Sequence, residues 1–225
     1  MKVLVINGSP SGEKSNTMHL TRAFLEGAKW TDAEVIDISK INVKGCTGCF
    51  SCWTKTPGKC IINDDVAKYL PKIVEADVII WSFPLYSCGF PGELKCFMDR
   101  QLPLGLPDMD TSSETGSHPT RYDFSKKRAF YISTCGFWTA QKNYDSIIKV
   151  LEHTGGNHEK FSIFCGQGAI FNEPDAKEVA DEYLKIVRRA GEECITGDIS
   201  EETQKALREP MFPKEVYEGF ANASW

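Results

Sequence analysis

The chain alternates short, continuously apolar segments with amphipathic ones, and this alternation limits its fold more than any other feature. Apolar and β-branched residues fill five segments that stop at turns, at residues 2–7, 34–38, 76–83, 128–134 and 161–165. Helical patterns occupy residues 15–30, the stretch from 64 onward, and residues 91–101, 144–152 and 175–189. Strands that are apolar throughout are buried on both faces, as in a parallel sheet covered by helices. The sequence therefore predicts a doubly wound α/β fold with five parallel strands.

The same pattern predicts one large domain with a short addition. No linker, repeat or low-complexity tract divides the 225 residues, so we expect a domain at residues 1–199. Residues 200–225 are expected to form a C-terminal extension that packs on this body or on a partner subunit. Its apolar residues follow helical spacing: Phe212, Val216, Tyr217, Phe220 and Trp225. Residues 102–125 form a long polar loop, and such loops are often lids or partner contacts.

Charge and hydropathy exclude several classes of protein. The net charge is −5 and no run of basic residues interrupts it, which argues against a nucleic-acid partner. No segment approaches the ~20 apolar residues of a membrane span, so we expect no membrane partner. The apolar stretch at the start is too short for a signal peptide. These features predict a cytoplasmic protein.

The loop after the first strand, residues 8–17, is rich in hydroxyl groups. It is not a G-x-G-x-x-G loop, because Pro10 replaces a required glycine, and not a Walker A loop, because Glu13 precedes Lys14. It leaves a set of donors at a helix N-terminus, namely Ser9, Ser11, Ser15, Asn16 and Thr17. Backbone N–H groups and the helix dipole add to these donors. We predict a phosphomonoester site here; the alternative is an ordinary loop with a capped helix.

Two more loops are expected at the same edge of the sheet. Residues 81–92, after the third strand, combine aromatic residues, glycines and two prolines, which suits apolar and backbone contacts with a flat ring. Residues 133–137, after the fourth strand, are small and polar. In a sheet of order 2-1-3-4-5, ligands bind beyond the carboxyl ends of the strands at the switch between strands one and three. The three loops are therefore predicted to meet around one ligand.

These loops carry a family resemblance. The Gly-Ser-Pro turn with its Ser-Asn-Thr cap, the segment 84–100 that ends in Phe-Met-Asp-Arg, and the Ser-Thr-Cys-Gly loop resemble the motifs of NAD(P)H-dependent FMN reductases. These are flavodoxin-like flavoproteins related to quinone reductases, and the resemblance covers about residues 1–190. It implies bound FMN, with the phosphate at Ser9, Ser15, Asn16 and Thr17. The isoalloxazine would lie against Pro84, Leu85, Tyr86, Ser87 and Gly89, and against Thr134, Cys135 and Gly136.

The resemblance also implies an activity. Members of the family pass a hydride from NAD(P)H to the flavin, which then reduces a quinone, a flavin or a similar small acceptor. Because the flavin carries this chemistry, no catalytic side chain is required. The active site in this family often lies at a subunit boundary, which implies a homodimer or a higher homo-oligomer. One departure is Ser11-Gly12, where relatives often carry a basic residue. A non-catalytic FMN carrier or sensor is an alternative function.

Four of the nine cysteines crowd into residues 45–60, a segment with no apolar period that we expect to be a loop. Cys46, Cys49, Cys52 and Cys60 have the compact spacing that can bind the irons of one cubane cluster. The spacing resembles that of the iron–sulfur flavoproteins, a branch of the same family. It implies an alternative function, in which a cluster passes single electrons between FMN and protein partners. Reduced thiols near the flavin mouth, a zinc site and a redox disulfide are the other interpretations.

Overall fold

A five-stranded sheet forms the centre of the computed structural model, which describes residues 1–112, 116–154 and 159–223. Its strands are β1 (Val3–Asn7), β2 (Glu34–Asp37), β3 (Val78–Pro84), β4 (Arg128–Thr134) and β5 (Glu159–Cys165). Within the described ranges they pair in parallel in the order β2-β1-β3-β4-β5. The flavodoxin-like topology and the order 2-1-3-4-5 are thereby confirmed.

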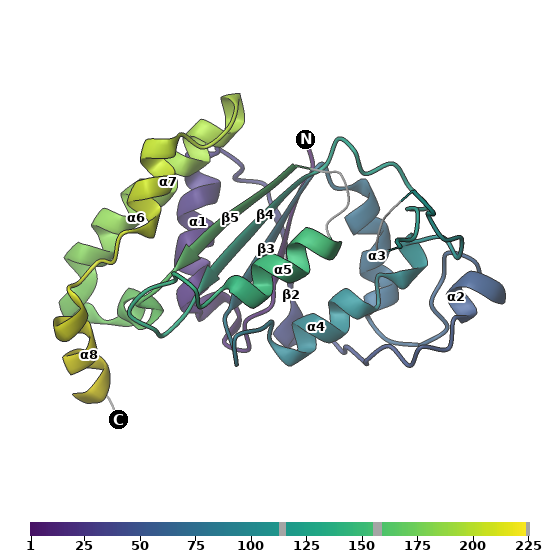
Figure 1. The fold of residues 1–225 in the computed structure, drawn as a ribbon, viewed down its shortest axis with the longest axis horizontal. Coiled ribbons are helices and arrows are strands. Elements are labelled where there is room, and N and C mark those ends of the chain that lie inside the picture. The colour runs from purple at the N-terminus through teal and green to yellow at the C-terminus, as the bar shows by residue number, and fades with distance from the viewer. Residues whose placement is uncertain (113–115, 155–158, 224–225) are drawn as a thin grey trace.

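Helices cover both faces of this sheet (Figure 1). The described part of the chain forms α1 (Asn16–Gly27), α2 (Ser51–Thr54), α3 (Val66–Glu75), α4 (Gly92–Asp99), α5 (Asp145–Thr154), α6 (Lys177–Thr196), α7 (Glu201–Arg208) and α8 (Lys214–Ala223). Helices α1 and α6 contact each other on one face of the sheet. Helices α3, α4 and α5 pack on the other face. Among the described helices, none is long and apolar enough to cross a bilayer.

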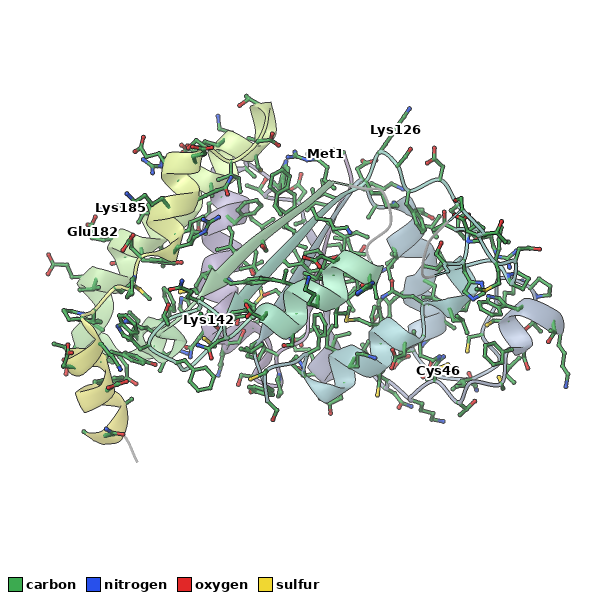
Figure 2. The ribbon with its side chains drawn as sticks, viewed as in Figure 1. Met1, Cys46, Lys126, Lys142, Glu182 and Lys185 are labelled. Carbon is green, nitrogen blue, oxygen red and sulfur yellow. The ribbon has the colours of Figure 1, made fainter. Side chains whose placement is uncertain are left out.

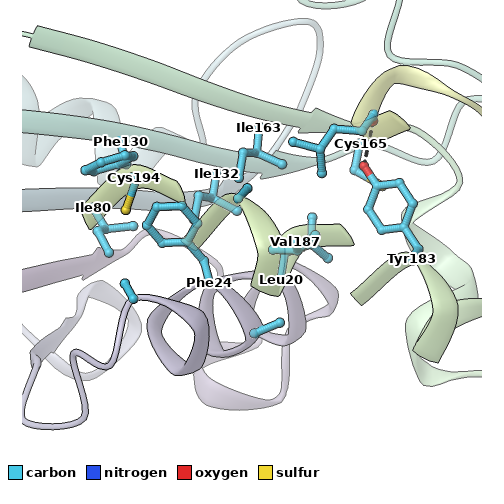
Figure 3. Close-up of a cluster of buried hydrophobic side chains, with 14 of the residues drawn as sticks. Leu20, Phe24, Ile80, Phe130, Ile132, Ile163, Cys165, Tyr183, Val187 and Cys194 are labelled. Carbon is cyan, nitrogen blue, oxygen red and sulfur yellow. Dashed lines mark hydrogen bonds between the residues drawn. The ribbon is translucent and has the colours of Figure 1, made fainter. Parts of the chain in front are cut away.

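Each face of the sheet carries its own hydrophobic core because successive side chains of a strand point to opposite sides. Val5 belongs to the core under α1 and α6, whereas Leu4 and Ile6 belong to the other. Figure 3 shows the first core, in which side chains of α1 and α6 meet those of the strands: Leu20, Phe24, Ile80, Phe130, Ile132, Ile163 and Val187. Full burial of one such side chain contributes about 1.5–3 kcal/mol.

Two glycines allow α1 and α6 to lie close together. A Cβ added at Gly191 of α6 would stand 2.2 Å from the carbonyl oxygen of Phe24. A Cβ at Gly27 of α1 would stand 2.0 Å from the carbonyl oxygen of Arg188. Both contacts are with backbone atoms, which cannot turn aside as a side chain can. The spacing of the two helices therefore depends on these glycines.

The structure differs from the sequence prediction at two places. Residues 45–60 were expected to be a loop, but they contain the short helix α2. Helix α6 runs beyond the predicted end at residue 189, because Ala190, Gly191 and Cys194 keep packing on the first core. Residues 102–125 form the expected loop, with a 3-10 turn at Leu102–Leu104, in so far as they are described.

The C-terminal extension is helical and lies on the body of the domain. Tyr217 of α8 is buried in the first core, and Phe212 and Phe220 pack against that core. Val216 of the predicted apolar stripe is exposed. Trp225, the last residue of the stripe, is outside the described residues.

Candidate functional site

The three predicted loops meet at the carboxyl edge of the sheet. Backbone hydrogen bonds connect them: the Gly8 N–H donates to the Ser82 carbonyl at 2.8 Å, and the Leu85 N–H donates to the Thr134 carbonyl at 2.9 Å. The buried hydroxyls of Thr17 and Thr134 hydrogen-bond to each other at 2.6 Å. The first loop therefore touches the third loop through side chains and the second loop through the strand beneath it.

The first loop, residues 8–17 with the opening of α1, is shaped by its own hydroxyl groups. The Ser9 hydroxyl accepts a hydrogen bond from the Ser11 N–H at 3.3 Å. The Ser15 hydroxyl caps α1 by accepting from the Met18 N–H at 3.3 Å. The loop can approach α4 because a Cβ at Gly8 would lie 2.5 Å from the Leu94 side chain. These contacts present the first N–H groups of α1, which have no acceptor within the helix.

Two further groups bear on whether this loop suits an anion. The side-chain Nδ2 of Asn7, buried where β1 ends, has no hydrogen-bond partner in the described structure. The Asn16 side chain contacts the amide of Asn172, which follows β5 and which the sequence did not single out. The Asn172 amide also bonds the ring of His19 at 3.0 Å. Helix N–H groups, hydroxyls and a buried unpaired amide are the donors that a phosphate group needs, so the loop fits the FMN phosphate.

The second loop contains a tight turn at residues 86–89. Tyr86 and Gly89 exchange backbone hydrogen bonds of 3.1 and 2.8 Å. The two residues between them, Ser87 and Cys88, have φ values of 48° and 56°, which non-glycine residues rarely adopt. The Ser146 hydroxyl, from α5, donates to the Cys88 carbonyl and supports the turn. Such strain is concentrated at functional sites.

The side chains around this turn differ in exposure. Leu85 is buried, Pro84 is half-buried, and Tyr86 is 49% exposed at the carboxyl edge. Phe137 of the third loop is also exposed, and a Cβ at Gly136 would meet nothing within 4 Å. Exposed aromatic rings beside open backbone suit a planar heterocycle, so this surface fits an isoalloxazine.

The third loop, residues 134–138, is held from below. The Cys135 N–H donates to the Cys165 carbonyl at 2.9 Å, and the Gly168 N–H donates to the Cys135 carbonyl at 2.8 Å. Burial raises the pKa of the Cys135 thiol and raises that of Cys165 to about 12. Both groups therefore stay protonated at neutral pH, and they fill space rather than act as nucleophiles.

The four clustered cysteines also come together, in a different part of the molecule. They line one small hollow that is open to solvent. Cys46 and Cys49 are exposed, Cys60 is half-buried and Cys52 is buried. The remaining wall consists mostly of apolar groups, with one charged side chain: Thr47, Phe50, Ile61, Ile62, Arg100, Leu102 and Pro103.

Local backbone geometry explains why these thiols share one hollow. Gly48 and Phe50 have φ values of 63° and 52°, so the chain turns sharply twice before α2 begins. Trp53 of α2 fixes this segment, because its indole N–H donates to the carbonyls of Leu102 at 3.2 Å and Gly105 at 3.1 Å. The long loop 102–125 thus supports the cysteine segment.

The thiols of the hollow differ in acidity. The backbone N–H and the hydroxyl of Ser51, with smaller help from Thr47, lower the pKa of Cys49. Burial raises the pKa of Cys52, and the neighbouring Cys60 raises it further. A thiolate is the form that binds metals, and the surroundings of Cys49 favour this form whereas those of Cys52 oppose it. Among the described residues, however, no three Cys, His, Asp or Glu side chains are arranged around one metal position.

Arg100 forms one side of the hollow. The sequence placed it at the end of the motif at residues 84–100 but indicated no role for it. Its side chain is fully buried, and its guanidinium donates two hydrogen bonds to the Asp64 carboxylate, of 2.6 and 3.0 Å. Burial lowers the pKa of the guanidinium, but contacts with Asp64 and Cys60 outweigh this effect and raise it. Its Nε is buried without a hydrogen-bond partner in the described structure. The hollow therefore has one member of a buried ion pair in its wall.

The two groups of residues lie at opposite ends of α4. The loop 84–91 leads into its first residue, Gly92, whereas Arg100 and the hollow follow its last residue, Asp99. In Figure 2, Cys46 lies far along the molecule from Lys142, which follows the third loop. A helix of eight residues spans about 12 Å. Helix α4 thus lies between the loop 84–91 and the hollow.

Comparison with known proteins identifies the family. The model of the NADPH-dependent FMN reductase family matches residues 1–137, which is more than half of the chain. The chain belongs to this family. The matched region ends inside the third loop of the carboxyl edge, so it includes the first two loops and the cysteine segment. The family resemblance expected from the motifs is confirmed.

Several curated relatives of this FMN reductase family member are named iron-sulfur flavoproteins. One from Methanocaldococcus jannaschii is 40% identical over 107 residues, 47% of this chain and 54% of the relative. One from Archaeoglobus fulgidus is 38% identical over 102 residues, 44% of this chain and 48% of the relative. The chain thus spans about half the length of these relatives. An FMN-dependent NADH:quinone oxidoreductase of Pseudoalteromonas atlantica is 26% identical over 145 residues, 59% of this chain and 71% of the relative.

Solved structures share the fold at low sequence identity. The NAD(P)H:quinone oxidoreductase from Methanothermobacter marburgensis superposes with a TM-score of 0.61 at 17% identity, covering 86% of this chain and 98% of that one. An FMN-dependent NADH-azoreductase from Bacillus anthracis gives a TM-score of 0.59 at 20% identity, covering 84% and 97%. These likenesses support the fold of this FMN reductase family member, which extends well beyond the matched residues 1–137.

Proposed function

We propose that this FMN reductase family member binds FMN at the carboxyl edge and carries reducing equivalents from NAD(P)H to a quinone, a flavin or a similar small acceptor. One observation carries the proposal: three loops far apart in sequence meet there, joined by the Thr17–Thr134 and Leu85–Thr134 hydrogen bonds. Their donors suit a phosphate and their exposed rings suit a flavin. A homodimer would complete the site, with the long loop and the extension as candidate contacts.

The residues of the chain act by binding and orientation. In the proposal the phosphate is held by N–H groups of α1 and by the polar side chains of Ser9, Ser11, Ser15, Asn16 and Thr17. The ring would be held by the second loop (Pro84, Leu85, Tyr86, Ser87 and Gly89) and by the third (Thr134, Cys135 and Gly136). FMN, when bound, would supply the capacity to accept a hydride and to pass electrons on. Because the Cys135 thiol stays protonated, it adds no competing charge beside the ring.

We also propose that Cys46, Cys49, Cys52 and Cys60 bind an iron–sulfur cluster, which is the second candidate function. The specific support is their common hollow. Four thiols are the usual ligand set of a cubane. The names of the curated relatives favour the same interpretation. Such a cluster supplies single-electron transfer.

Reconstitution with FMN, iron and sulfide tests both sites at once. The expected result is one flavin per chain, with about four irons and four sulfides. A double Cys49→Ser and Cys52→Ser variant should lose the iron and keep the flavin, because the hollow and the carboxyl edge lie at opposite ends of α4. Flavin without iron in the unmodified protein would contradict the cluster. Absence of flavin would contradict the whole proposed function.

A further inference from the structure

The C-terminal extension reaches the third loop of the carboxyl edge. The Tyr217 hydroxyl of α8 donates a hydrogen bond of 2.8 Å to the Gly136 carbonyl. The Trp138 indole N–H, within the loop, donates to the Phe212 carbonyl of the extension at 3.2 Å. Figure 1 shows α8 beyond the ends of β4 and β5, where this loop begins. The extension thus contacts a loop that we assign to the flavin ring.

Gln167 joins the extension to the same loop from the other side. Its side chain exchanges two hydrogen bonds of 2.9 Å with the backbone of Phe212. Its own N–H donates to the Phe137 carbonyl at 2.7 Å. Gln167 is fully buried and has a left-handed backbone, with φ at 56°, so the turn after β5 adopts a strained form to make these contacts. Gln167 therefore links the loop to the extension, in addition to the bonds of Tyr217 and Trp138.

The bond from Tyr217 restrains Gly136 directly, whereas its neighbours Cys135 and Phe137 are already held by backbone hydrogen bonds to Cys165, Gly168 and Gln167. Gly136 has no side chain, and a Cβ there would meet nothing within 4 Å. The backbone freedom that a glycine keeps in its loop must be lost when a ligand binds against it. A partner that fixes its carbonyl in advance removes this cost and strengthens ligand binding. Tyr217 is suited to this task because it is itself buried.

We propose that the C-terminal extension is a positioning element of the flavin site. Tyr217 from the extension, together with Gln167 from the turn after β5, holds the loop 134–138 in its ring-binding form. The inference rests on the proposed FMN site and deepens it. Gln167, Phe212 and Tyr217 all lie outside residues 1–137, which the family model matches. In this proposal, a part of the chain that the family match does not cover has a role in flavin binding.

Tyr217→Phe tests the proposal by removing one hydroxyl and leaving the ring. Since one hydrogen bond is lost, the Kd for FMN should rise about 3- to 10-fold. The Kd for riboflavin should rise by the same factor, because the loop faces the ring and not the phosphate. Amide hydrogen exchange of the loop 134–138 in the flavin-free protein should become faster, which reports the loop without any ligand.

Tyr183→Phe is the matched control. The Tyr183 hydroxyl also donates to a backbone carbonyl of the extension, that of Leu207 at 2.8 Å, and Tyr183 is equally buried. This variant should lower thermal stability by a similar amount and leave both flavin affinities unchanged. Unchanged FMN affinity in Tyr217→Phe, or equal losses in both variants, would overturn the inference alone. Failure of the unmodified protein to bind FMN would overturn the proposed function and the inference together.

Discussion

At the scale of single residues, Thr17 and Asn16 serve the fold and the proposed phosphate site together. The Thr17 hydroxyl joins α1 to Thr134 of the third loop, and the Asn16 side chain contacts Asn172. Their backbone N–H groups open α1, where an anion is favoured. The site therefore uses side chains that are already held in place by protein contacts.

Replacing both residues should separate the two ends of the flavin. We predict that Asn16→Ala with Thr17→Ala weakens FMN binding about 10-fold or more, since two polar contacts near a charged group are lost. Riboflavin, which lacks the phosphate, should lose less affinity. Fluorescence titration of the two flavins measures the difference, and equal losses for both would refute the phosphate assignment.

Arg100 and Asp64 form a buried ion pair whose two members depend on each other. Both side chains are fully buried, and Asp64 also accepts a hydrogen bond of 2.9 Å from the Lys44 N–H. Asp64→Asn would leave the guanidinium charged and uncompensated, so we predict a loss of about 3–5 kcal/mol in the free energy of unfolding. Urea denaturation measures it. Asp99, whose exposed carboxylate pairs with Lys95 on the surface of α4, provides the control, and Asp99→Asn should change stability little.

The same pair predicts a dependence on pH. Burial by itself raises the pKa of the Asp64 carboxyl, but the hydrogen bonds from Arg100 and Lys44 outweigh it and lower the folded pKa below the ordinary 3.8. A carboxyl with a lowered folded pKa stabilises the protein above its unfolded pKa and loses this contribution as pH falls through the folded value. Stability should therefore drop below about pH 4. A parallel drop in Asp64→Asn would show that Asp64 is not the cause.

At the scale of elements, the packing of α1 on α6 depends on a glycine in each helix. Gly191→Ala would drive a methyl group into the Phe24 carbonyl, so we predict a loss of about 1–3 kcal/mol. Gly219, also within a helix, is the control, because a Cβ there meets nothing within 4 Å. Gly219→Ala should stabilise the protein by about 0.5–1 kcal/mol. Equal effects in thermal unfolding would contradict the close approach.

The strands were predictable because their signal is local. Continuous apolar runs gave every strand to within two residues of its observed ends, and Arg128–Thr134 without error. The N-cap at Ser15 was equally local. By contrast, α2 lies in a segment with no apolar period, and it depends on the bonds from Trp53 to the distant residues Leu102 and Gly105.

The candidate site was predictable only in part, for the same physical reason. Loops at the ends of neighbouring parallel strands must share an edge, so their meeting followed from topology. The roles of Gln167 and Tyr217 rest on contacts across many residues, and nothing in the local pattern indicates them. Arg100 had a weak signal, because a charged residue that follows an apolar helical pattern is ordinarily exposed.

At the scale of the whole molecule, two chemically distinct places lie at opposite ends of α4. The carboxyl edge offers hydroxyls, N–H groups and exposed rings, and the hollow offers thiols beside a buried ion pair. In the proposal the first binds a two-electron cofactor and the second a one-electron centre. A protein with both can accept a hydride at one end and release single electrons at the other.

The central claim is that FMN at the carboxyl edge turns over with a nicotinamide, and anaerobic reduction of the FMN-reconstituted protein tests it most directly. We predict that NADH or NADPH bleaches the absorbance of the bound flavin and that a quinone then restores it. Retention of FMN without bleaching by either nucleotide would contradict the claim and indicate an electron carrier or sensor instead.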